Sequence, residues 1–105
     1  MIHVKSESEI DLMRESCKIV RDTLEFVASR IKAGMSTKEV DELAERYIRS
    51  AGAYPSCLGY GGFPAAACVS VNETVVHGIP DERTILKDGD IVTVDLCAYK
   101  NGYHG

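Results

Sequence analysis

The apolar pattern of this 105-residue chain changes at Gly52, and that change limits the folds open to it. Before Gly52, apolar residues recur at steps of three and four, which is the spacing of one face of an α-helix. After Gly52, short apolar runs are separated by turn residues, which is typical of strands. The sequence therefore predicts two helices followed by antiparallel strands, an α+β arrangement.

Two capping boxes mark the starts of the predicted helices. Ser6 precedes Glu9 by three residues, and Ser36 precedes Glu39 in the same way, so each pair can satisfy free N–H groups at a helix N-terminus. Gly34 is the expected stop of the first helix. The apolar stripes expected to face the core are Ile10, Met13, Cys17, Val20, Leu24, Val27 and Ile31 in the first helix, and Val40, Leu43, Ala44, Tyr47, Ile48 and Ala51 in the second.

The second part of the chain contains three predicted strands, at 68–71, 74–77 and 91–99. Asn101-Gly102 is a strong signal for a two-residue type I′ hairpin turn. Only three residues follow this turn, so we interpret residues 1–105 as the N-terminal part of one longer domain. A two-residue turn at Asn101-Gly102 sets the hairpin register, which pairs Lys100 with Tyr103, Tyr99 with His104 and Ala98 with Gly105.

Charge and composition exclude several classes of protein. Lys and Arg number 12 against 16 Asp and Glu, a net charge of −4, without a basic cluster, so we expect no nucleic-acid binding. No apolar run approaches the roughly 18 residues that cross a bilayer, and the N-terminus resembles no secretory signal. The four cysteines form no CxxC pair and are interpreted as reduced thiols of a cytoplasmic protein.

Asp95 is the first candidate for a functional role, because it interrupts a predicted apolar strand. A carboxylate among aliphatic residues is costly unless it is paired, hydrogen-bonded or bound to a metal ion. A salt bridge or backbone N–H groups would also account for it. A residue following Gly105 would lie diagonal to Asp95 across the hairpin, where a second carboxylate would complete a metal-binding pair. The face shared with Asp95 is expected to carry Ile91, Thr93, Cys97 and Tyr99.

His77 is the second candidate, because it ends a predicted strand just before a turn. It could act as a general acid or base, a metal ligand or a hydrogen-bond donor to a substrate, or it could be a satisfied, partly buried histidine. The sequence contains no motif for a hydrolytic nucleophile. If the protein is a hydrolase, a metal ion must therefore activate the water.

The glycine-rich loop at 58–64 is the third candidate. Tyr60 and Phe63, flanked by Cys57 and Cys68, suit an apolar pocket for a thioether side chain. The alternative is a connector whose aromatic residues fill the local core.

Five motifs occur in order along nearly the whole chain. They are Cys57-Leu-Gly-Tyr60-x-Gly-Phe-Pro64, Val69-Ser-Val-Asn72-Glu, Val76-His77-Gly-Ile-Pro80, Leu86-Lys-Asp-Gly-Asp90-Ile-Val, and Val94-Asp95 through Gly102-Tyr103-His104-Gly105. Together they resemble the type I methionine aminopeptidases. The resemblance implies the N-terminal half of the pita-bread (creatinase/aminopeptidase) fold, in which two pseudo-symmetric α+β halves enclose a two-metal site.

The resemblance also implies roles for individual residues. Asp95 matches one of the family's metal ligands, which are two aspartates, one histidine and two glutamates holding two divalent ions (Co, Mn, Fe or Zn). The second aspartate would follow Gly105, and the other three ligands would lie in the missing half. His77 matches the histidine that contacts the scissile amide and assists the leaving amine. The wall of the methionine pocket would be formed by Cys57, Tyr60, Phe63 and Cys68, and a monovalent cation would bind near Asn72 and Thr74.

The implied activity is removal of the initiator methionine from nascent polypeptide N-termini, at the ribosome in the cytoplasm. Because residues 1–105 contain only one of the ligands, this chain alone is expected to be inactive. Its sheet face is expected to be exposed and to self-associate. Two alternatives remain: a non-catalytic pita-bread binding module, and a small α+β domain without a site.

Overall fold

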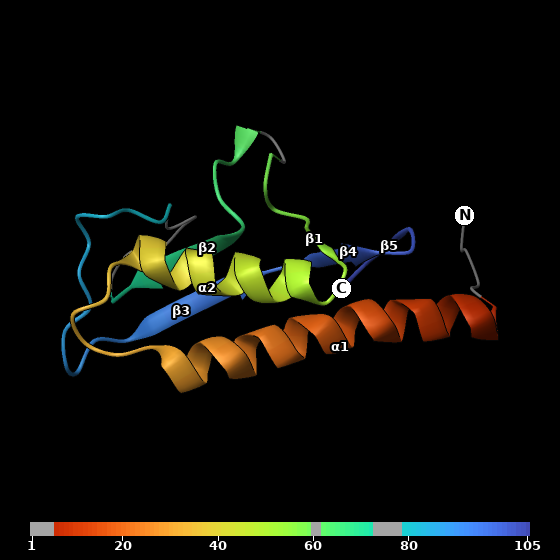
Figure 1. The fold of residues 1–105 in the computed structure, drawn as a ribbon, viewed down its shortest axis with the longest axis horizontal. Helices are drawn as coiled ribbons and strands as arrows, with labels where there is room; N and C mark the ends of the chain where they lie inside the picture. The colour runs from red at the N-terminus through yellow and green to blue at the C-terminus, as the bar shows by residue number, and fades with distance from the viewer. Residues whose placement is uncertain (1–5, 60–61, 73–78) are drawn as a thin grey trace.

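A computed structural model describes residues 6–59, 62–72 and 79–105 of the chain. Two helices come first and short strands follow, so the predicted α+β order is confirmed (Figure 1). The predicted strand at 74–77 lies outside the described residues. The elements are α1 (Glu7–Arg30), α2 (Thr37–Ser50), β1 (Tyr54–Pro55), β2 (Ala67–Val71), β3 (Val92–Leu96), β4 (Ala98–Lys100) and β5 (Tyr103–His104). No helix among the described residues is both long and apolar enough to span a membrane.

Both predicted capping boxes are confirmed. In α1 the Ser6 hydroxyl accepts the Glu9 N–H at 3.3 Å, and the Glu9 carboxylate accepts the Ser6 N–H at 3.0 Å. The equivalent bonds at the start of α2 join Ser36 and Glu39 at 3.1 and 3.2 Å. Each box satisfies N–H groups that the first helical turn leaves free. Helix α1 ends at Arg30, four residues before Gly34, which was the predicted stop.

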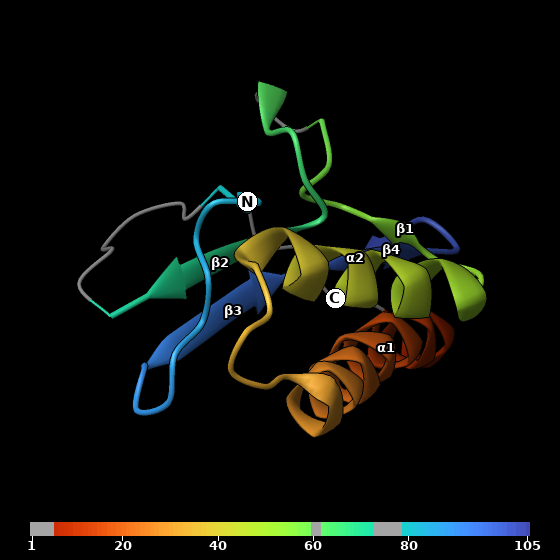
Figure 2. The ribbon, with the colours of Figure 1, turned by 60° about the vertical axis from the view of Figure 1, so that its left-hand side comes forward.

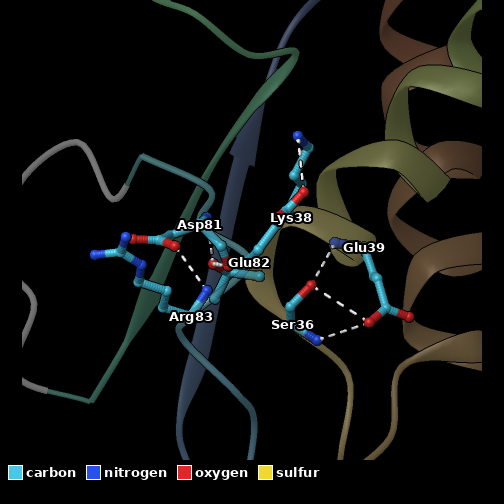
Figure 3. A network of polar contacts seen from close by, with 7 residues as sticks. Ser36, Lys38, Glu39, Asp81, Glu82 and Arg83 are labelled. Carbon is cyan, nitrogen blue, oxygen red and sulfur yellow. Dashed lines mark hydrogen bonds and ion pairs between the residues drawn. The ribbon is translucent and has the colours of Figure 1, made fainter.

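The start of α2 is also tied to the segment that precedes β3. Figure 3 shows the α2 capping box beside this segment, where Lys38 Nζ lies 3.4 Å from Glu82 Oε1. In the same segment, Asp81 Oδ1 accepts the Arg83 N–H at 2.7 Å. The Thr37 hydroxyl donates to the Asp81 carbonyl at 3.0 Å and accepts the Asp81 N–H at 2.8 Å, and these two bonds hold the segment against the first turn of α2.

The buried side of α1 differs from the predicted stripe. Ile10, Cys17 and Leu24 were expected in the core, and they are exposed. The reason is that α1 packs against the backbone of the β4–β5 hairpin, where the Ser16 hydroxyl donates to the Tyr103 carbonyl at 2.8 Å. This close approach favours small polar residues over large apolar ones. The buried residues of α1 are Ser16, Ile19, Thr23 and Val27.

The strands form two small sheets that share one continuous stretch of chain. One sheet has the order β1-β4-β5, and the other pairs β2 with β3. The chain passes from the second sheet to the first at Cys97, between β3 and β4. The predicted hairpin register is confirmed, with Lys100 opposite Tyr103, Tyr99 opposite His104, and Ala98 hydrogen-bonded to Gly105 in both directions.

The core lies between the helices and one face of the sheets (Figures 1 and 2). Residues 56–59 and 62–66 project from the sheets away from α1, as both views show. The helix-facing side therefore supplies stability, and the opposite side is open. The core is formed mainly by Ile19, Val27, Met35, Val40, Ala44, Ile48, Val69, Leu86, Leu96 and Ala98.

Candidate functional site

Asp95 lies on the open face of the sheet. It is in β3, directly opposite Cys68 of β2, and its side chain is exposed. The predicted alternation is confirmed, since Leu96 and Ala98 face the core. The expectation that Asp95 lies in a buried strand is wrong, because β3 is covered on one face only, and Asp95 and Thr93 are exposed on the other. Among the described residues no lysine or arginine forms an ion pair with Asp95.

Three cysteines, Cys57, Cys68 and Cys97, lie near this carboxylate. Cys57 and Cys97 line a pocket of about 300 Å³ together with Ser56 and His104. Burial raises the pKa of the Cys57 thiol to about 11, and the nearby charges of Cys97, Cys68 and Asp95 add to the rise. Burial, followed by Asp95, also raises the pKa of Cys68. The Cys57 and Cys68 thiols therefore stay neutral near pH 7, and a neutral thiol offers a soft, polarisable contact that suits a thioether.

The structure brings together part of the predicted pocket. Cys68 lies opposite Asp95 in the sheet and is one of the neighbours that raise the pKa of Cys57. Phe63 is half-buried, and its carbonyl accepts the Gly59 N–H at 2.8 Å. Tyr60 and His77, the predicted pocket and catalytic residues, lie outside the described residues.

Asn72 uses its side chain to fasten β2 to β3. Its Oδ1 accepts the Ile91 N–H at 2.9 Å, and its Nδ2 donates to Asp90 Oδ1 at 3.0 Å. The bond from Asn72 and a second from the Lys87 N–H lower the pKa of the half-buried Asp90 carboxyl. Thr74, the other residue predicted near a monovalent cation, lies outside the described residues, so that site stays a prediction.

Sequence reasoning missed two polar contacts near the site. The Ser56 hydroxyl and His104 Nδ1 are hydrogen-bonded at 2.8 Å, and the His104 ring lies 4.7 Å from the Tyr99 ring. The predicted hairpin register already placed His104 opposite Tyr99, and this was the one feature of the sequence that pointed to the position of His104.

The second missed contact involves Asp41, which is buried in α2. Its carboxylate accepts the Ala67 N–H at 2.8 Å at the start of β2, and burial raises the pKa of Asp41.

The described residues do not form a complete metal centre. Asp95 offers an oxygen donor suited to hard and borderline divalent ions. Within residues 6–59, 62–72 and 79–105, however, no group of three or more His, Cys, Asp or Glu side chains could hold a metal ion. Any metal pair held by Asp95 therefore needs ligands from elsewhere.

Comparison with known proteins points to one family. Residues 11–105 match the family described as Metallopeptidase family M24. The chain is 53% identical to methionine aminopeptidase 1 of Bacillus subtilis (strain 168), and the match covers 100% of this chain and 42% of that protein.

Solved structures agree with this match. The crystal structure of methionine aminopeptidase from Rickettsia prowazekii superposes with a TM-score of 0.95 at 36% identity, covering 100% of this chain and 42% of that one. The corresponding enzyme from Thermotoga maritima gives 0.94 at 40% identity, with the same coverage. The chain thus spans less than half the length of these relatives.

Proposed function

Since the chain belongs to metallopeptidase family M24, we propose that it is the N-terminal part of a methionine aminopeptidase with the pita-bread fold. The full-length enzyme removes the initiator methionine from nascent polypeptides in the cytoplasm, at the ribosome. The observation that carries this proposal is the position of Asp95, on an open sheet face beside the thiols of Cys57 and Cys68. The identity to the Bacillus subtilis enzyme along the whole chain supports it.

In this proposal Asp95 is one ligand of a pair of divalent ions, Co, Mn, Fe or Zn. Such ions activate water and polarise a carbonyl group. The remaining ligands come from the part of the enzyme that follows the matched span. His77 contacts the scissile amide, and Asn72 and Thr74 hold a monovalent cation. The methionine side chain binds against Cys57, Tyr60, Phe63 and Cys68.

Residues 1–105 alone are catalytically silent in this proposal, because a single exposed carboxylate cannot hold two ions against water. The non-catalytic binding module is the less favoured alternative, since relatives along the whole chain are aminopeptidases by name and Asp95 and His77 are both present.

The test compares residues 1–105 with the full-length enzyme on a peptide that begins with methionine. The short chain should release no methionine with any divalent ion, and the full-length enzyme should release it. Asp95→Asn in the full-length enzyme should abolish metal binding, measured by calorimetry, together with activity. His77→Ala should lower turnover and leave metal affinity near normal.

The matched control is Asp11→Asn, which removes an exposed carboxylate of α1 that pairs with Arg14. This variant should keep full activity and metal affinity. Normal turnover in Asp95→Asn would overturn the proposal, and so would a full-length protein that binds no divalent ion.

A further inference from the structure

Ser56 and His104 join two parts of the site that lie far apart in the sequence. The Ser56 hydroxyl and His104 Nδ1 are 2.8 Å apart, although 48 positions separate the residues. Ser56 directly precedes Cys57, and His104 is in β5, on the face of the hairpin that carries Cys97 and Asp95. Both partners line the pocket that contains the Cys57 and Cys97 thiols.

The histidine is held firmly by its own strand. Gly105, the next residue, donates its N–H to the Ala98 carbonyl at 2.7 Å and accepts the Ala98 N–H at 3.3 Å. The ring of His104 also packs against Tyr99, its partner in the hairpin register. His104 therefore presents Nδ1 from a fixed position.

The serine is held at a second point. Its backbone N–H donates to the Cys97 carbonyl at 3.0 Å, two residues after Asp95. With the hydroxyl bound to His104, the two polar groups of Ser56 are attached to β5 and to the link between β3 and β4. The loop that carries Cys57 begins at this anchor, and the Leu58 N–H bonds back to Pro55 at 3.1 Å.

We propose that Ser56 and His104 are positioning residues, which set the distance between the methionine pocket and the metal-binding strand. This inference rests on the proposed function. Neither residue needs to touch the substrate, because the pair acts through Cys57 and the loop that follows it. Small displacements of a substrate from its productive position are costly, so an anchor between pocket and reacting centre matters for efficiency.

The test uses the full-length enzyme and four variants. Ser56→Ala removes the hydroxyl, and His104→Phe removes Nδ1 while keeping a ring against Tyr99. A hydrogen bond of this kind is worth about fivefold to tenfold in an equilibrium constant. KM for a methionine peptide should therefore rise about fivefold in each variant, with kcat within about twofold and metal affinity unchanged. The double variant should be no worse than either single one, and Ser56→Thr should restore KM.

A second measurement does not depend on catalysis. The rate at which iodoacetamide modifies Cys57, followed by mass spectrometry, should rise severalfold in Ser56→Ala and in His104→Phe, while modification of Cys68 stays constant. The control is Ser29→Ala, which removes an exposed hydroxyl that donates to the Phe26 carbonyl within α1. That variant should change neither KM nor the Cys57 rate.

The possible results separate the two proposals. An active enzyme whose KM and Cys57 rate do not respond to Ser56→Ala overturns the positioning role and leaves the proposed function intact. Additive losses in the double variant, or a parallel fall in metal affinity, also overturn it. A full-length protein without aminopeptidase activity overturns the proposed function and the effect on KM, and the Cys57 rate still decides whether the pair anchors the loop.

Discussion

The Cys57 thiol is kept neutral by its surroundings, and this determines how it can behave. Burial is the main cause, and the charges of Cys97, Cys68 and Asp95 add to it. A thiolate is the reactive form of cysteine, so a thiol with a high pKa is a poor nucleophile at neutral pH. Cys57 is therefore suited to contact an apolar ligand and unsuited to attack one.

We predict that iodoacetamide modifies Cys57 slowly at pH 7.5, much more slowly than the exposed Cys17, and that the rate rises toward pH 11. Mass spectrometry of labelled peptides measures both rates in the same sample. Equal rates for the two cysteines at pH 7.5 would contradict the burial of Cys57.

The same pKa predicts a loss of stability at high pH. The pKa of Cys57 lies near 11 in the folded chain and at 9.0 in the absence of structure, so the unfolded chain releases this proton first. The free energy of unfolding should therefore fall as pH rises from 9 toward 11. Cys57→Ala should reduce this fall, which is measured by urea unfolding at several pH values.

At the scale of elements, Asp41 connects α2 to the strand that faces Asp95. Its carboxylate is buried and accepts the Ala67 N–H at 2.8 Å, which fixes the first residue of β2. A buried N–H without an acceptor costs about 1–3 kcal/mol. Asp41 therefore holds β2 in the position that sets Cys68 opposite Asp95.

We predict that Asp41→Ala speeds amide hydrogen exchange in β2 by about fivefold to a hundredfold, the factor that corresponds to losing this acceptor. Exchange of a peptide that covers residues 66–71 measures the effect. Glu42→Ala is the control, because Glu42 is the exposed neighbour of Asp41 in α2, and it should leave exchange in β2 unchanged. Equal exchange in Asp41→Ala and the wild-type chain would exclude this anchoring role.

Local elements of this fold could be predicted from the sequence, because their causes lie within a few residues. The capping boxes join residues three apart, and the hairpin register follows from Asn101-Gly102, with φ values of 53° and 85°. The buried side of α1 could not be predicted in this way. It depends on Gly105 lying directly against the Ser16 backbone, a contact between the two ends of the chain.

In the candidate site, too, the features with local causes could be predicted and those that depend on distant contacts could not. Alternation along 91–99 correctly placed Asp95 and Cys97 on one face, because strand geometry is local. Whether that face is covered depends on the whole assembly, so the exposure of Asp95 could not be read from the pattern. The Ser56–His104 bond joins two sheet edges, and Asp41 reaches a strand 26 residues away, so neither has a local signal.

At the scale of the whole molecule, the chain exposes more surface than a compact protein of its mass. Its accessible surface is 6,879 Å², whereas a compact monomer of this size exposes about 5,800 Å². Its radius of gyration is 14.7 Å, against about 13 Å for a compact domain of similar length. Part of the excess lies on the face that carries Asp95, where Ile91 is 71% and Tyr99 40% exposed.

We predict that residues 1–105 self-associate through this open face, because an apolar surface facing water favours contact with a second copy. Sedimentation equilibrium should show dimers or larger species at micromolar concentrations. Ile91→Lys should weaken the association at least tenfold, since a lysine would have to lose its hydration at the contact. Ile10→Lys is the matched control, because Ile10 is 39% exposed on α1, away from the open face, and this variant should change the association little.

A monomeric wild-type chain, or equal effects of the two lysine variants, would show that this face is not the contact. If the contact is confirmed, the full-length enzyme should associate less than the short chain, because the same face is then covered within one molecule.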